Sequence, residues 1–146
     1  MIKRFDHFTI VVEDEAEAKR FFEVVGFREQ TSVVISGERF ADYMGVPAIK
    51  ARHITLVAEN VSPRTEIQLL KLLHPDPVPD PHVRDLSKIG FNHVCFEVDD
   101  IDAALADFEA AGFRSRAGIL DFHSRKLAFV WGPGGITVEI AQWYSS

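Results

Sequence analysis

The chain has 146 residues, of which 47% are hydrophobic and 26% are charged. This length suits one domain, or two small modules that share a core, and the composition excludes a disordered chain, a coiled coil and a collagen-like repeat. The formal net charge of −6 argues against nucleic-acid binding as the main activity, and the apolar runs are too short to span a membrane. A lone cysteine, Cys95, and the absence of a leader segment indicate a reduced, cytoplasmic protein.

The first and last thirds of the chain repeat each other. Residues 7–28 align without a gap with residues 93–114. Such self-similarity indicates two copies of one supersecondary unit. The identical pairs are His7 and His93, Val12 and Val98, Asp14 and Asp100, Ala18 and Ala104, Phe22 and Phe108, Glu23 and Glu109, Gly26 and Gly112, Phe27 and Phe113, and Arg28 and Arg114.

The first copy predicts a strand, a helix and three further strands. Residues 7–12 are rich in β-branched and aromatic side chains, which are typical of strands. Asp14 can cap a helix over 15–25, whose apolar residues recur at helical spacing, and Gly26 suits the left-handed position at its end. We expect a loop with one helical turn at 39–44, and strands over 31–36, 51–57 and 66–72.

A linker and the second copy follow. Prolines at alternate positions predict an extended linker, and a Gly-Pro-Gly-Gly turn at 132–135 leads into the last strand. The pattern therefore predicts an α+β fold in which two βαβββ modules form one curved mixed sheet, a cup with the helices outside. The expected parts are a first module at 1–73, the linker at 74–89 and a second module at 90–146; the second contains strands over 93–98, 117–120, 126–131 and 136–143 and a helix over 101–111.

Polar side chains at equivalent places in the two copies could meet in the cup. His7 and His93 occupy the same position on the first strands, and Glu139 aligns with Gln68 on the last strands. Alternation along a strand places Gln68 opposite to core-facing Ile67, on the same face as Glu66. Two imidazoles with oxygen ligands suit a divalent metal ion such as Zn, Ni, Co, Mn or Fe(II). A single histidine in a strand is more often structural, and a glutamate in a strand usually faces solvent. The metal-site prediction therefore depends on the occurrence of these residues together, at equivalent positions of the two copies.

The sequence resembles the vicinal oxygen chelate superfamily, which includes glyoxalase I, methylmalonyl-CoA epimerase, extradiol dioxygenases and the fosfomycin- and bleomycin-resistance proteins. The resemblance covers nearly the whole chain and is carried by the segments 6–12 (DHFTIVV), 22–27 (FEVVGF), 92–98 (NHVCFEV) and 132–140 (GPGGITVEI). It implies paired βαβββ modules, and His7, Gln68, His93 and Glu139 as metal ligands. The order His, Gln, His, Glu is similar to that of methylmalonyl-CoA epimerases, whereas glyoxalase I enzymes usually carry Glu at the second place.

The resemblance implies a divalent-metal-dependent isomerase or lyase of glyoxalase or epimerase type, which stabilises an enolate of a small carbonyl substrate. Glu139 or Glu66 would move the proton, and His123 and Arg125 could contact an anionic substrate, although each has a plain structural reading. No Lys or Arg cluster in the sequence obviously suits a coenzyme A or glutathione tail. Alternatives are an extradiol dioxygenase, a fosfomycin-resistance-like transferase, and a metal-free small-molecule binding protein of the same fold. We expect a small-molecule substrate and a homodimer, with no nucleic acid or membrane as partner.

Overall fold

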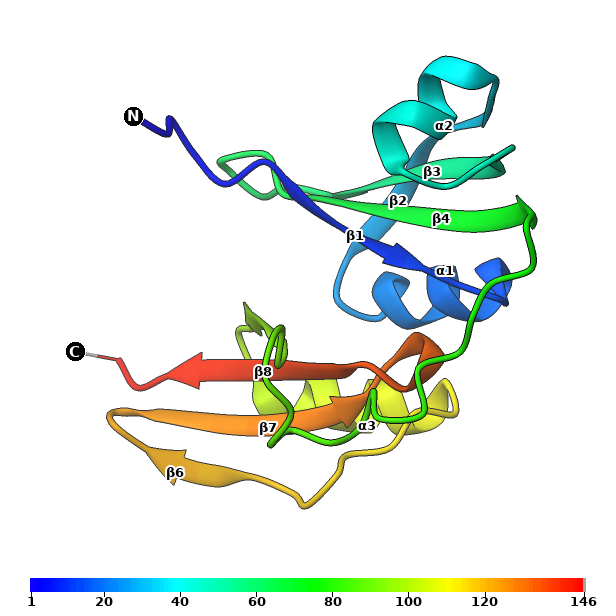
Figure 1. Ribbon diagram of the computed structural model, residues 1–146. Coiled ribbons are helices and arrows are strands. Elements are labelled where there is room, and N and C mark those ends of the chain that lie inside the picture. The colour runs from blue at the N-terminus through cyan, green and yellow to red at the C-terminus, as the bar shows by residue number, and fades with distance from the viewer. Residues whose placement is uncertain (146) are drawn as a thin grey trace. The chain divides into compact units, whose positions relative to one another are not determined.

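Within residues 1–145, which the computed structural model describes, hydrogen bonds group the strands into two four-stranded mixed sheets (Figure 1). The chain divides into two compact units, Met1–Pro79 and a second that starts at Asp80. The division falls inside the predicted linker. Each unit carries one sheet and one long helix, so the predicted α+β class and the paired βαβββ modules are confirmed. Within the described residues no helix is long and apolar enough to cross a bilayer.

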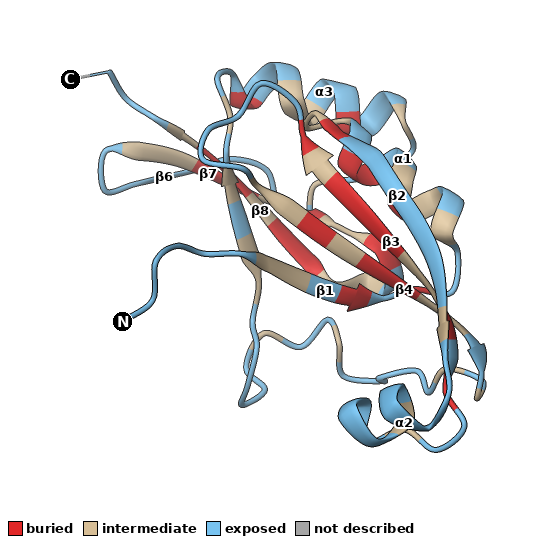
Figure 2. Ribbon diagram, turned by 90° about the horizontal axis from the view of Figure 1, so that it is seen from above, coloured by how far each residue is buried: buried red, intermediate tan, exposed pale blue. Residues whose placement is uncertain are grey.

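Unit 1 forms a sheet with the strand order β1-β4-β3-β2, in which β1 runs parallel to β4 and the other neighbours are antiparallel. Phe21 and Phe22 of its first helix are fully buried, and the Phe22 ring meets that of Phe27 edge to face, with 5.9 Å between the ring centroids. Buried residues run along β3 and β4 in Figure 2. Its elements are β1 (His7–Val11), α1 (Glu15–Glu23), β2 (Phe27–Ser36), α2 (Glu38–Met44), β3 (Lys50–Ala58) and β4 (Glu66–His74).

Unit 2 repeats this plan with the strand order β5-β8-β7-β6, and β5 runs parallel to β8. Phe108, the counterpart of Phe22, is likewise fully buried. Burying each of these rings stabilises its unit through the hydrophobic effect by roughly 1.5–3 kcal/mol. The elements are β5 (Val94–Glu97), α3 (Ile101–Ala110), β6 (Leu120–Phe122), β7 (Arg125–Trp131), a 3-10 turn (Pro133–Gly135) and β8 (Thr137–Trp143).

The ends of the two long helices follow from the repeated residues. The side chain of Asp14 accepts a hydrogen bond from the Glu17 backbone N–H at 3.0 Å, and Asp100 accepts one from the Ala103 N–H at 3.0 Å. Each aspartate thus satisfies an amide that has no partner inside the helix. Gly26 and Gly112 adopt φ values of +97° and +92°, which a side chain would disfavour. The predicted caps and the left-handed glycines of both helices are confirmed, whereas α1 ends at Glu23 and α3 at Ala110, before the predicted ends at 25 and 111.

The register of the first strand on the last strand is the same in both units. Thr9 pairs with Gln68 in unit 1, and its repeat counterpart Cys95 pairs with Glu139 in unit 2. In unit 1, His7 pairs with Glu66. The sheet geometry therefore supports the sequence alignment of Gln68 with Glu139.

Three segments of the chain differ from their predicted structure. Strand β2 begins at Phe27, four residues before the predicted start at 31. The segment predicted as a loop with one helical turn at 39–44 contains a full helix, Glu38–Met44, which ends at Gly45 in the left-handed conformation. The short strand β6 lies at Leu120–Phe122, later than the predicted 117–120, because His123 and Ser124 both adopt positive φ and form a tight turn into β7. Positive φ at two successive residues is the geometry of a two-residue hairpin turn, which the residues His-Ser do not signal in sequence.

Candidate functional site

In each unit one face of the sheet packs on the helix and the other carries the predicted polar side chains. Gln68 lies between Ile67 and Leu69, both with no exposed surface, and Glu139 lies between Val138 and Ile140, which are also fully buried. The side chains of Glu66 and Glu139 are each 14% exposed. Alternation along the strand thus explains why these polar groups share the face away from the core.

In unit 1, His7 lies beside two carboxylates. Its Nδ1 donates a hydrogen bond to Asp6 Oδ1 at 2.5 Å, and the same nitrogen is 3.9 Å from Glu66 Oε2. Asp6, His7 and Glu66 each offer one ligand atom, and these atoms lie within 4.8 Å of one another. The hydrogen bond from His7 lowers the pKa of Asp6. The chemistry of this donor set, imidazole with carboxylate oxygen, fits a divalent transition-metal ion.

Gln68 is held in a chain of hydrogen bonds across the same face. Its Oε1 accepts from His53 Nε2 at 2.9 Å, and its Nε2 donates to Glu66 Oε2 at 2.8 Å. Glu66 in turn accepts from Arg64 at 2.8 Å. Burial raises the pKa of Glu66, but the hydrogen bonds from Arg64 and Gln68 outweigh burial and hold that pKa below its usual range. Glu66 is therefore ionised at neutral pH and lies nearer His7 than the predicted ligand Gln68 does in the sheet register.

In unit 2, His93 and Glu139 lie together. His93 Nε2 is 3.4 Å from Glu139 Oε1, and His93 Nδ1 donates to Asn92 Oδ1 at 2.7 Å. The ring of Phe129 meets the imidazole edge to face, with 5.1 Å between the ring centroids. The hydrogen bond and the ring contact orient the imidazole, so that Nε2 and the carboxylate face the same space.

Asp6 and Asn92 are site residues that sequence reasoning missed. Both precede the histidine at repeat-equivalent positions, and both accept a hydrogen bond from its Nδ1. A proton on Nδ1 leaves the Nε2 lone pair free for a metal, and a partner of this kind fixes the tautomer and raises the basicity of the ligand. The signal was present in the sequence as an oxygen-bearing side chain immediately before each repeated histidine.

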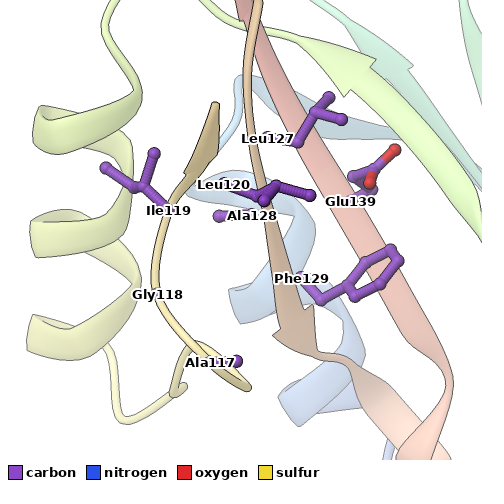
Figure 3. Close-up of a pocket in the computed structure, with 8 residues that line it drawn as sticks. All are labelled: Ala117, Gly118, Ile119, Leu120, Leu127, Ala128, Phe129 and Glu139. Atoms are coloured by element: carbon purple, nitrogen blue, oxygen red, sulfur yellow. The ribbon is translucent and has the colours of Figure 1, made fainter. Parts of the chain in front are cut away.

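A mostly apolar pocket of about 320 Å³ adjoins Glu139 in unit 2 (Figure 3). The carboxylate of Glu139 and the ring of Phe129 project from neighbouring strands in this view. Glu139 is the one acidic residue of the lining, which is otherwise formed by Ala117, Gly118, Ile119, Leu120, Leu127, Ala128 and Phe129. This lining suits an apolar group of a small molecule held next to the carboxylate.

The two predicted substrate contacts lie at the β6–β7 turn. The His123 ring packs on Phe122 at 4.0 Å between centroids, and the Arg125 guanidinium lies 4.6 Å from the centroid of the Trp143 ring. Arg125 shares a face with Phe129, which pairs with Glu139. Four residues of strand separate Arg125 from Phe129, about 13 Å, so Arg125 can contact only an extended substrate of the Glu139 site.

The Cys95 thiol gives a chemical readout of the unit 2 half of the site. Partial burial, and then the neighbouring Glu139 carboxylate, raise the pKa of Cys95 to about 12. We expect the chelator-treated folded protein to react very slowly with iodoacetamide at pH 8, because the reactive thiolate is nearly absent, and to react faster as the pH rises. Glu139→Gln should accelerate alkylation, and Glu97→Gln, a weaker influence, should do so less. Mass spectrometry measures the alkylation rate of the parent protein and of the two variants. Alkylation of the parent protein at the rate of a free cysteine at pH 8 contradicts the prediction.

Comparisons with known proteins agree with these features. The family profile described as the glyoxalase/bleomycin resistance protein/dioxygenase superfamily matches residues 6–129. The lactoylglutathione lyase of Schizosaccharomyces pombe is 27% identical over 142 residues, which are 95% of this chain and 45% of that protein. The chain thus spans less than half the length of that relative. An uncharacterized protein of Escherichia coli, YaeR, is 26% identical over 95% of both chains.

Solved structures show the same fold. A glyoxalase family protein from Bacillus cereus superposes with a TM-score of 0.89 at 23% identity, over 99% of this chain and 97% of that one. The fosfomycin resistance protein FosX from Mesorhizobium loti has a TM-score of 0.59 at 15% identity, over 97% of this chain and 93% of that chain. With a profile match over most of its length and two repeated modules of this fold, the chain belongs to the glyoxalase/bleomycin resistance protein/dioxygenase superfamily.

Proposed function

We propose that the protein is a divalent-metal-dependent isomerase or lyase that acts on a small carbonyl compound. The proposed ligands are His7, Gln68, His93 and Glu139. One observation carries the proposal: Nδ1 of each histidine donates to the preceding side chain, and the carboxylate of a last-strand glutamate lies within 4 Å of one ring nitrogen, Nδ1 in His7 and Nε2 in His93. A purely structural histidine does not require this arrangement twice.

A cation bound by these residues would act as a Lewis acid and lower the pKa of a C–H bond next to a carbonyl. The protein's own groups would then bind the substrate and move the proton. Glu139 lines an apolar pocket that could hold the substrate and exclude water from it. Glu66 is the second candidate proton acceptor, but its lowered pKa makes its carboxylate a weaker base than an ordinary glutamate.

The relatives support the reaction class. The S. pombe relative is a lactoylglutathione lyase, and the match to it covers 95% of the present chain. The likeness to FosX favours the alternative of a fosfomycin-resistance-like enzyme only at the level of the fold, since the identity is 15%.

A metal-free binding protein of the same fold is the second candidate, and the apolar pocket beside Glu139 favours it. An antibiotic-binding protein from Streptomyces, TnmS3, shares the fold with a TM-score of 0.62 at 20% identity. In this alternative the pocket would sequester a small apolar molecule without chemistry. An extradiol dioxygenase is a third possibility, because it requires two histidines and one glutamate, which His7, His93 and Glu139 would supply.

The test is metal-dependent hydrogen exchange. The protein is treated with chelator, reloaded separately with Zn, Ni, Co, Mn or Fe(II), and incubated in D₂O with a panel of small 2-oxo and 2-hydroxycarbonyl compounds. NMR then follows deuterium incorporation next to the carbonyl. We expect exchange with at least one metal and none after chelation. Tight binding of metal without exchange, together with oxygen uptake on catechols, would instead assign a dioxygenase; no binding of any of the metals would leave the binding-protein alternative.

A further inference from the structure

Two arginines that are distant in sequence meet at one tryptophan in unit 2. The Arg84 guanidinium carbon lies 4.5 Å from the centroid of the Trp131 ring, and that of Arg116 lies 5.1 Å from it. Both arginines are exposed, and neither forms an ion pair with an acidic side chain among the described residues. Two cations on one ring, neither in an ion pair with a carboxylate among the described residues, leave local positive charge in a chain whose net charge is −6.

The arginine pair lies on the same sheet face as the His93–Glu139 half of the site. Trp131 pairs with Thr137, and Phe129, two residues earlier on β7, pairs with Glu139. Alternate residues share a face, and two residues of strand span about 7 Å. Phe129 also contacts the His93 ring. The two guanidinium groups therefore border the place where a molecule bound at His93 and Glu139 would extend.

Gly135 leaves the space that Arg84 occupies. A β-carbon at Gly135 would lie 3.0 Å from Val83 Cγ1 and 3.3 Å from Arg84 Nε, closer than side chains ordinarily approach. Gly135 also adopts φ of +84°, which a side chain disfavours. The turn before β8 thus has a glycine where any larger residue would push Arg84 away from Trp131.

We infer that Arg84, Arg116 and Trp131 form an anion clamp that holds a phosphoryl group of the substrate. Each guanidinium presents a planar fork of donors that matches the oxygens of a phosphoryl group, and two such cations balance a dianion, whereas a single carboxylate needs only one fork. The inference rests on the proposed function for its substrate and names its class, a small carbonyl compound that bears a phosphoryl group. The pair is not visible as a basic cluster in the sequence, because Arg84 and Arg116 are distant along the chain and meet only at Trp131 in the fold.

The clamp can be tested without any metal. Trp143→Phe leaves Trp131 as the one tryptophan, and its fluorescence is followed while inorganic phosphate is added to the chelator-treated protein. We expect saturable binding that Arg84→Gln and Arg116→Gln each weaken by about tenfold or more, because each removes charge-assisted hydrogen bonds. Arg114→Gln is the matched control: it removes the same charge nearby, while Arg114 contacts Trp131 through its backbone carbonyl.

The outcomes separate a clamp from a structural contact and from general electrostatics. Unchanged phosphate affinity in the Arg84→Gln/Arg116→Gln double variant overturns the clamp, and so does an equal loss in Arg114→Gln. A merely structural role would lower thermal stability in the arginine variants without any phosphate-dependent fluorescence change in the parent protein.

A second measurement asks whether the phosphoryl group belongs to the substrate. Dihydroxyacetone phosphate, a carbonyl phosphate, is compared with inorganic phosphate before and after metal loading. We expect metal to tighten binding of the carbonyl phosphate alone, since only that ligand reaches both the metal and the clamp. Equal effects of metal on the two ligands overturn the assignment to the substrate. If the protein binds no metal but phosphate still binds through the arginines, the proposed function fails while the clamp stands.

Discussion

His93→Ala is expected to abolish stoichiometric metal binding, and His7→Ala to do the same. Each substitution removes one of two imidazoles from the proposed ligand set. The loss of metal affinity should therefore be larger than the effect of about 10–100-fold that follows removal of a residue that only supports a ligand. Titration calorimetry with Zn, Ni, Co and Mn, and metal analysis after dialysis, measure the effect. Circular dichroism checks that each variant is folded.

His82→Ala provides the control for a general loss of histidine. His82 lies in the linker region, where its backbone N–H donates to Asp80 Oδ1 at 2.9 Å, so its removal should leave metal binding unchanged. Asp6→Ala and Asn92→Ala should reduce metal affinity by about 10–100-fold, because each fixes the tautomer of a ligand rather than binding the metal. Metal binding at the parental level in both histidine variants would remove the basis of the proposed enzyme.

The parts of the fold that could be predicted are those determined by residues close in sequence. Asp14 and Asp100 cap their helices through a backbone amide three residues away, and both caps lie where the sequence placed them. The polar face carrying Gln68 and Glu139 follows from strand alternation alone. Because the sequence repeat shows each of these features in both copies, the α+β fold class and the paired modules could be deduced from one chain.

The parts that could not be predicted depend on which strands pair and in what register. His53 contacts Gln68 because β3 pairs with β4, and nothing in the local sequence gives His53 a role. The two arginines at Trp131 come from the linker region and from the segment before β6, so their meeting is a property of the tertiary fold. The sequence indicated only one turn of helix α2, because the helix contains no buried residue and therefore has no apolar stripe that marks its full length.

The charges around Gln68 and Glu66 distinguish the two candidates for the proposed oxygen ligand in unit 1. Glu66 is already neutralised by Arg64, which donates to it at 2.8 Å, so metal ligation by Glu66 would compete with that ion pair. Gln68 is the register counterpart of Glu139, and its amide oxygen contacts His53 at 2.9 Å and Thr9 at 3.4 Å rather than a guanidinium group. Turning a neutral amide toward a cation costs less than separating a carboxylate from a guanidinium. Gln68 is therefore the favoured ligand.

Gln68→Ala is accordingly expected to lower metal affinity by more than 100-fold. Glu66→Ala should lower it by about 10–100-fold, because Glu66 orients the Gln68 amide through a hydrogen bond and does not bind the metal itself. Gln68→Glu should retain metal binding, because a carboxylate can replace the amide as an oxygen ligand. Competition titrations against a chelating dye measure all three variants under the same conditions. The opposite ranking, with the larger loss in Glu66→Ala and little change in Gln68→Ala, would assign the ligand to Glu66, whose carboxylate would then have to exchange Arg64 for the metal.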